Sequence, residues 1–354
     1  MRILNRIELI QKINKNKFDF YAQLYSLLFA IILIFFILFL SGLNIVDAVI
    51  SFFYFSFGSW FLFNENLIII GILGISSIGI TLAKKCNFWN IGGEGQILLG
   101  ALGGVLVALF WPETAYLFGN FTAIVLSLLF GGLIPLIIAI LKVKRGADEV
   151  VLTLLSNFII ILLIAFLVSG PLQDQATKWI QSPTISSNFT LPKIFGFGRL
   201  GISIVIYCII LIFFFLIEKF TLLNSSLLVL GDNINSLRII GYKTLPLFYI
   251  TIFLSGALCG LSGWLEVSNY QYRLIENLVP SYGYYAILIA VLANSKILNT
   301  AFYTIICAII LNGIDGVSRE FDLPIFMNYI VFGATFIFYS IIFKLKGKKI
   351  IIKK

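Results

Sequence analysis

The stretch that decides the fold reads Trp89-Asn90-Ile91-Gly92-Gly93-Glu94-Gly95-Gln96, and it lies between two long apolar runs. Three glycines loosen its backbone, and Glu94 places a carboxylate close to hydrocarbon. Non-helical backbone at membrane depth is tolerated only where protein buries it or where it lines a water-filled cavity. An ionisable residue at that depth is a candidate for a functional site. The alternative is a loop with a tight helix contact, in which Glu94 only caps backbone amides.

The same stretch predicts how the next helix begins. Asn90 is a residue type that caps helix N-termini, so we expect a helix from Ile91 onward with Glu94 in its first turn. A carboxylate is favoured there by the helix dipole. Three glycines of this helix share one face: Gly93, Gly100 and Gly104. Another helix can therefore approach that face closely.

Composition places the chain in a membrane. Of its 354 residues, 60% are hydrophobic and 12% are charged, and the mean hydropathy is +1.04. Long, nearly uncharged apolar runs predict an all-α, polytopic membrane protein, whereas a β-barrel would alternate apolar and polar residues. The chain has no histidine, and its four cysteines show no metal-ligand spacing. We therefore expect no metal, no cofactor and no enzymatic activity in this chain.

Ten transmembrane spans are expected, at about residues 24–43, 65–82, 91–111, 120–141, 149–169, 200–217, 245–266, 283–294, 298–313 and 324–343. The eighth is too short to cross alone, so it is expected to be a re-entrant or half helix. The aromatic run 52–63 is interpreted as an interfacial segment. Spans two to five and seven to ten form an expected inverted repeat, because each set has a glycine-interrupted second member. The second interruption is at residues 281–285.

The basic residues predict the orientation. Of the 25 Lys and Arg, 20 fall in segments that are cytoplasmic if the N-terminus is inside. The chain is then divided into a cytoplasmic tail (1–23), a transmembrane domain (24–343) and a basic cytoplasmic tail (344–354). This distribution explains the net charge of +9 without a nucleic-acid partner.

Polar residues inside the spans are the other candidates. Glu149, Thr153 and Asn157 recur at intervals of four and so form one stripe, which faces either the pathway or a neighbouring helix. In the seventh span a second set of glycines predicts tight helix packing: Gly256, Gly260 and Gly263. Tyrosines near the outer end of spans seven and eight stack on a solute ring or, as the preferred interpretation, form an aromatic belt: Tyr270, Tyr272, Tyr282, Tyr284 and Tyr285.

Four parts of the chain resemble one family. Residues 89–96 are similar to the Asn-Ile-Gly-small-Glu-Gly-Gln signature of the permeases of ABC importers for nucleosides and simple sugars. Residues 146–157 resemble that family's Glu-Val…Asn entry to the fifth span, and residues 255–267 resemble its Gly/Ala-rich seventh span. Four residues of the inner loop fit its cytoplasmic coupling segment: Gly231, Asn233, Arg238 and Gly241. The family belongs to the branched-chain amino acid and ribose permease superfamily.

The resemblance implies a function and a set of partners. It implies a permease subunit in the bacterial cytoplasmic (inner) membrane, which forms the pathway for a nucleoside or a related sugar-containing solute. A second related permease, a cytoplasmic ABC ATPase and an extracytoplasmic binding lipoprotein of the basic-membrane-protein type are the implied partners, with membrane lipid around them. The central motif is then Asn90, Gly92, Gly93, Glu94 and Gln96, together with Glu149, Thr153 and Asn157. The chain has no P-loop, so ATP hydrolysis is expected on another chain. An ion-coupled secondary transporter and a membrane-embedded enzyme are the alternatives.

Overall fold

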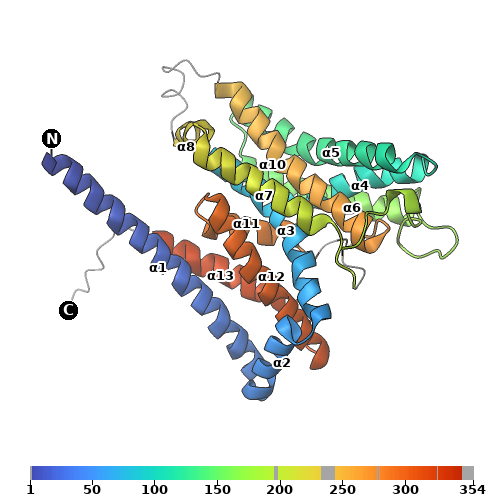
Figure 1. Cartoon of the computed structure of the whole chain (residues 1–354), viewed down its shortest axis with the longest axis horizontal. Helices are drawn as coiled ribbons and strands as arrows, with labels where there is room; N and C mark the ends of the chain where they lie inside the picture. Colours follow the sequence, from blue (N-terminus) through green and yellow to red (C-terminus); the bar gives the residue numbers. More distant parts are fainter. Residues whose placement is uncertain are drawn as a thin grey trace. The chain divides into compact units, whose positions relative to one another are not determined.

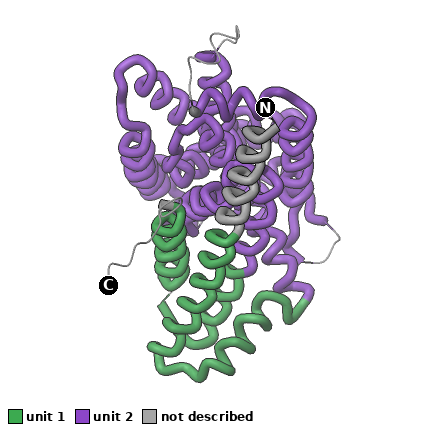
Figure 2. Tube along the Cα trace, turned by 90° about the vertical axis from the view of Figure 1, so that its left-hand side faces the viewer, with its two compact units in different colours: residues 1–59, 310–354 green, residues 60–309 purple. Residues whose placement is uncertain are grey.

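The structure is a computed structural model, and it describes residues 2–194, 198–232, 244–276, 278, 280–324 and 326–344. These residues form helices joined by loops, and no named strand occurs among them, which confirms the all-α prediction. The chain divides into two compact units, residues 1–59 with 310–354 and residues 60–309 (Figure 2). The second unit contains the stretch 89–96.

Eight helical segments in the described part of the chain are long and apolar enough to cross a membrane. They are the end of α1 (Arg2–Leu40), α3 (Trp60–Lys85), α4 (Gly93–Phe110), α5 (Tyr116–Arg145), α6 (Glu149–Ser169), α7 (Ser203–Phe220), α10 (Thr244–Glu266) with the π-helix η2 (Val267–Gln271), and α12 (Ile297–Glu320) (Figure 1). Shorter helices are α2 (Ile45–Phe57), α8 (Leu223–Asp232), α11 (Tyr282–Leu292) and α13 (Met327–Lys344). Each predicted span coincides with one of these helices, so the polytopic membrane architecture is confirmed.

The segment predicted to be interfacial falls on two helices. Residues 52–63 are the end of α2 and the start of α3, which are separated at Gly58 and Ser59. The α2 helix begins at a local signal, because the Asn44 side chain accepts a hydrogen bond from the amide of Val46 at 3.0 Å. Asp47 lies in the first turn, where the helix dipole favours it.

Three glycine-rich helices form the packed centre of the second unit. Helix α10 lies against both α5 and α4 (Figure 1). A Cβ built on Gly260 would lie 2.2 Å from the carbonyl oxygen of Ser127, and one on Gly263 would lie 1.9 Å from that of Ile97. Gly256 meets α5 in the same way, since its Cβ would lie 2.4 Å from the oxygen of Gly131. Backbone therefore touches backbone along α10, which no larger residue permits.

Two residues, Gly146 and Asp148, determine the turn between α5 and α6. Gly146 ends α5 in the left-handed conformation, with a φ of 68°. Asp148 then caps α6, because its carboxylate accepts from the amides of Val150 and Val151. The turn is short, so α6 starts next to the end of α5 and its buried face, which includes Thr153, is directed into the unit.

The described part of the predicted outer loop is tied to the end of α10. The amides of Ser182, Ile185 and Leu191 donate to carbonyl oxygens of residues 268–274. Phe189 of the short helix η1 (Ser187–Phe189) is fully buried, and its ring meets that of Trp264 edge to face. This loop is therefore fixed to the membrane helices, while Trp179 remains 72% exposed.

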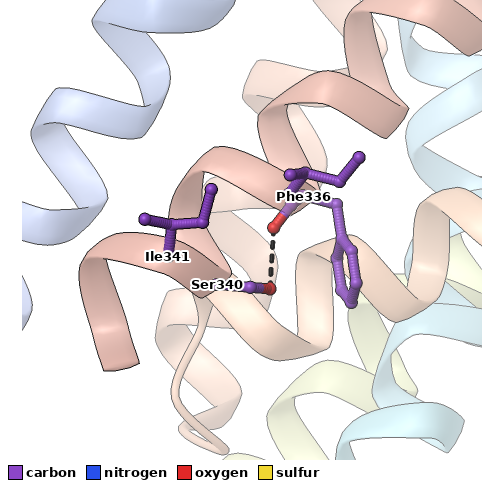
Figure 3. Close-up of a pocket in the computed structure, with 4 residues that line it drawn as sticks. Phe336, Ser340 and Ile341 are labelled. Carbon is purple, nitrogen blue, oxygen red and sulfur yellow. Dashed lines mark hydrogen bonds between the residues drawn. The ribbon is translucent and has the colours of Figure 1, made fainter. Parts of the chain in front are cut away.

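In the first unit, α1 packs on α13 and α2 packs on the last turns of α12. The Phe29 and Phe338 rings stack at 4.1 Å, and the Ser51 hydroxyl donates to the Glu320 carboxylate. A hollow of about 240 Å³ on α13 is lined by Phe336, Ile337, Ser340 and Ile341 (Figure 3). The Ser340 hydroxyl is used within the helix, where it donates to Phe336 O at 2.8 Å. The lining of the hollow is therefore mostly apolar.

Candidate functional site

The site forms where two helix N-termini meet. Helix α4 begins at Gly93, and α11 begins at Tyr282 after Ser281, whose φ is 61°. A Cβ built on Gly283 would lie 2.0 Å from the amide nitrogen of Glu94 and 2.5 Å from its Cα. A Cβ on Gly93 would lie 3.3 Å from Gly283 Cα. The two backbones are therefore in contact, and the two glycine-interrupted segments of the sequence lie together.

Glu94 joins these two helices. Its side chain is 6% exposed, and its Oε2 accepts a hydrogen bond of 2.8 Å from the amide of Gly283. That amide lies in the first turn of α11, and an amide at this position has no acceptor within its own helix. The helix dipole places partial positive charge at the same point. Glu94 thus caps α11, although it belongs to the first turn of α4.

Asn90 has a different role from the one expected. Helix α4 begins at Gly93 with Gly92 as its N-cap, so the predicted start at Ile91 is wrong. Asn90 instead forms a closed side-chain pair with Gln96, with bonds of 2.9 and 2.8 Å. Its Oδ1 also accepts from the Gly92 amide, and its Nδ2 also donates to Ser255 Oγ. These bonds tie Asn90 to Gly92 and to Gln96 in the first turn of α4. The chain therefore turns between Asn90 and the start of α4.

Two members of the α6 stripe complete the loop. Asn157 is fully buried: its Oδ1 accepts from the Gly95 amide at 2.9 Å, and its Nδ2 donates to Ile91 O at 2.8 Å. The same Nδ2 lies 3.3 Å from the hydroxyl oxygen of Tyr284 on α11. Thr153 Oγ1 accepts from the Ile91 amide at 3.1 Å. Asn157 therefore connects α6 with the loop and with α11.

Glu149, the third member of the stripe, lies apart from this centre. It forms an ion pair with Lys142 at the end of α5. The Lys142 ammonium also lies 5.4 Å from the centre of the Phe88 ring. The stripe therefore divides into two buried residues at the helix contact and one charged residue at the α5–α6 turn.

Most of the tyrosines are not placed as a lipid-facing belt would require. Tyr270, Tyr282 and Tyr285 are each less than 9% exposed. The Tyr270 hydroxyl bonds the hydroxyl of Ser203 at 2.5 Å. The belt interpretation is therefore wrong for these three residues, because protein rather than lipid covers them. Tyr284 is half-buried and is the one residue of α11 that is not buried.

Sequence reasoning missed Lys84 at the other end of α11. Its ammonium group donates to Ala290 O at 2.9 Å and to Val291 O at 3.2 Å. A cavity of about 10 Å³ lies beside it, with Trp89 and Asn90 among its lining residues. That volume holds about one water molecule. The position of Lys84, directly before a polar loop, could have indicated this role. The sequence analysis used Lys84 only as evidence for the orientation of the chain in the membrane.

Of the predicted coupling residues, the structure describes one. Gly231 lies in α8, and a Cβ built on it would lie 2.7 Å from the carbonyl oxygen of Lys85. Asn233, Arg238 and Gly241 lie outside the described residues. Helix α8 thus packs directly on the end of α3, and Lys85 lies eight positions before Gly93, where α4 begins. Among the described residues, no three or more Cys, Asp or Glu side chains lie together in a group that could hold a metal ion.

The sequence matches the family described as "Branched-chain amino acid transport system / permease component" over residues 62–340. The chain belongs to this family of membrane transport permeases. It is 28% identical over 299 residues to the glucose ABC transporter permease of Haloferax volcanii, covering 80% of this chain and 78% of that one. It is 27% identical to the guanosine ABC transporter permease of Bacillus subtilis, covering 73% and 74%. It is 23% identical to the nucleoside ABC transporter permease of Lactococcus lactis, covering 72% and 73%.

Proposed function

We propose that this chain is the permease subunit of an ATP-driven ABC importer and forms the pathway for a nucleoside or a related sugar-containing solute. The family match and the names of the relatives support this proposal. The observation that carries it is the contact between the α4 and α11 N-termini, which Glu94 bridges. In many transporters the substrate site is formed by discontinuous helices whose N-termini meet near the middle of the membrane.

The contacts separate residues that hold the loop from residues that meet the solute. Asn90, Gln96 and Asn157 are buried and bonded to protein groups, so they fix the shape of the loop. Trp89, the first residue of that loop, is 39% exposed, and Tyr284 on the adjacent α11 is half-buried. Their rings offer flat apolar faces, and the Tyr284 hydroxyl offers a polar edge. These two residues are therefore assigned to contact a base or a sugar ring.

The proposed complex supplies what this chain lacks. Energy comes from a cytoplasmic ABC ATPase, which docks on the segment from Gly231 to Gly241, with Asn233 and Arg238 within it. A second related permease completes the pathway, and a binding lipoprotein delivers solute to the outer loop. Exposed apolar residues on α6 and α7, such as Phe166 and Phe213, face lipid or that second permease.

The proposed location is the bacterial cytoplasmic membrane, with both termini inside. The division into a cytoplasmic tail (1–23), a transmembrane domain (24–343) and a basic tail (344–354) follows from the charge distribution. The chain itself is proposed to be a transport subunit without catalytic residues, cofactor or metal.

The test is uptake by the native complex. The complex is isolated from its own membrane through a tag on this chain, its other subunits are identified by mass spectrometry, and it is placed in proteoliposomes. We expect a copurified ABC ATPase and uptake of labelled guanosine or glucose that requires hydrolysable ATP. Uptake that runs on an ion gradient without ATP, and that an uncoupler stops, would instead support a secondary transporter.

A further inference from the structure

Two adjacent lysines end α3, and they bind different neighbours. The Lys84 ammonium donates to the carbonyl oxygens of Ala290 and Val291, at 2.9 and 3.2 Å. These carbonyls belong to the last turn of α11, and that of Val291 also accepts a hydrogen bond of 3.2 Å from the amide of Asn294. A cation is also favoured at a helix C-terminus by the dipole. Helix α11 is therefore held at its start by Glu94 and at its end by Lys84.

Lys85 is 4% exposed and binds away from α11. Its ammonium lies 3.1 Å from Glu218 Oε2 on α7 and 2.7 Å from Asn224 Oδ1 on α8. The same Glu218 oxygen accepts from the amide of Ile297, the first residue of α12. The buried lysine is thus paired with a carboxylate and a carbonyl oxygen, as a stable buried cation requires.

Helix α8 is attached to the end of α3 by backbone as well as by this lysine. A Cβ built on Gly231 would lie 2.7 Å from Lys85 O and 3.0 Å from the Asn87 amide. Leu227 and Leu230 of α8 also belong to the apolar cluster that contains Cys86 at the α3 end. A displacement of α8 must therefore shift residues 85–87, because no space separates the two backbones.

We propose that the end of α3 transmits a displacement of α8 to α11, with Lys84 as the positioning residue that carries it across. The contacts run from α8 to Lys85, along one residue of backbone to Lys84, and from there to the end of α11. Helix α11 has 11 residues and is about 16 Å long, so it moves as one short rod. Its far end is bonded to the Glu94 carboxylate of α4 through the Gly283 amide. This inference rests on the proposed function, in which the ATPase acts at the segment that follows α8.

The first test replaces Lys84 in the intact complex. Lys84→Met keeps the apolar stem but removes the ammonium, whereas Lys84→Arg keeps a charged donor. Lys219→Met is the matched control, because that ammonium lies over the Phe220 ring and does not contact α11. We expect ATP-driven uptake to fall about tenfold with Lys84→Met, a usual size for coupling between sites, and to return partly with Lys84→Arg.

The second test follows the movement itself. Spin labels at Ser225 on α8 and at Ser281 before α11 are each paired with a label at Phe158 on α6, in a chain with the exposed Cys208 replaced by serine. Distances are measured with and without a non-hydrolysable ATP analogue. In the native chain we expect both distances to change. With Lys84→Met, the distance from Ser225 should still change, and the distance from Ser281 should not.

The outcomes distinguish this inference from its alternatives. If Lys84→Met leaves uptake and both distance changes as in the native chain, the transmission role is refuted. If it only lowers the melting midpoint while both distances still change, Lys84 is a cap of α11 and nothing more. If the Lys84→Met complex does not assemble, Asn224→Ala tests the same path at the contact between α8 and Lys85, without changing a contact of α11. Native uptake and both native distance changes with Asn224→Ala would refute the transmission role. Failure of the native complex to take up solute with ATP would refute the proposed function instead.

Discussion

Replacement of Glu94 by glutamine and by alanine tests how the two helices are held together. Glu94→Gln keeps the size of the side chain and an oxygen acceptor, but it removes the carboxylate that accepts from the Gly283 amide at 2.8 Å. A hydrogen bond to a charged group contributes roughly 1.5–3 kcal/mol, against about 0.5–1.5 kcal/mol for a neutral pair. A favourable charge at a partly buried helix terminus contributes up to about 2 kcal/mol. We therefore expect Glu94→Gln to destabilise the protein by about 1–3 kcal/mol.

Glu94→Ala removes the acceptor as well. The buried Gly283 amide then has no partner, which costs about 1–3 kcal/mol beyond the lost charge. The order of stability should be native, then Glu94→Gln, then Glu94→Ala. Uptake should fall in the same order, because the hydrogen bond that joins Glu94 of the 89–96 loop to Gly283 of α11 is weakened and then lost.

The assay is the melting midpoint of the purified complex in detergent, measured beside solute uptake in proteoliposomes. Glu113→Gln is the matched control, since it makes the same chemical change at an exposed carboxylate. If the Glu94→Gln and Glu94→Ala complexes both have the same melting midpoint as the Glu113→Gln complex, the capping of α11 by Glu94 is refuted. Full uptake with Glu94→Gln would remove the charge from the mechanism but would leave the family assignment intact.

Three further predictions concern topology, coupling and the solute. Reporter fusions should report the cytoplasm after Lys85, Arg145, Lys243 and Lys346 and the exterior after Asp174; a fusion after Lys243 found outside would overturn the charge-based orientation. Arg238→Glu should abolish uptake while the chain still inserts, and unchanged uptake with normal ATPase recovery on pull-down would leave residues 231–241 a plain connector. Trp89→Ala should raise the half-saturating solute concentration about two- to tenfold, since an aromatic pair contributes about 0.5–1.5 kcal/mol. An unchanged concentration would remove Trp89 from the pathway.

Local signals were sufficient to predict most helices. Apolar runs predicted α5 and α6 as separate spans, at about residues 120–141 and 149–169, and the structure agrees. Helix α2 was missed although Asn44 and Asp47 carry its start signal, because the aromatic content of residues 52–63 was given more weight. A cap of this kind is local and can be read from a sequence.

The central contact could be predicted only in part. The sequence identified two glycine-interrupted segments, but the partner of Glu94 lies on α11, far away along the chain. Periodicity places Thr153 and Asn157 on one face of a helix, yet it does not state which backbone groups that face will meet. The contact of Lys84 with the end of α11 also could not be predicted, because a lysine at the end of a span is usually explained by the orientation of the chain in the membrane. Contacts between distant segments require the packed structure.

The most direct test of the central claim, that the α4 and α11 N-termini meet backbone to backbone, is one substitution made at two glycines. Gly283→Ala places a Cβ 2.0 Å from the Glu94 amide nitrogen, whereas Gly333→Ala on α13 meets nothing within 4 Å. Overpacking of this kind costs about 1–3 kcal/mol or more. We predict that Gly283→Ala lowers the melting midpoint of the complex and abolishes uptake, while Gly333→Ala leaves both at native values. A Gly283→Ala complex that melts and transports like the native one would contradict the claim.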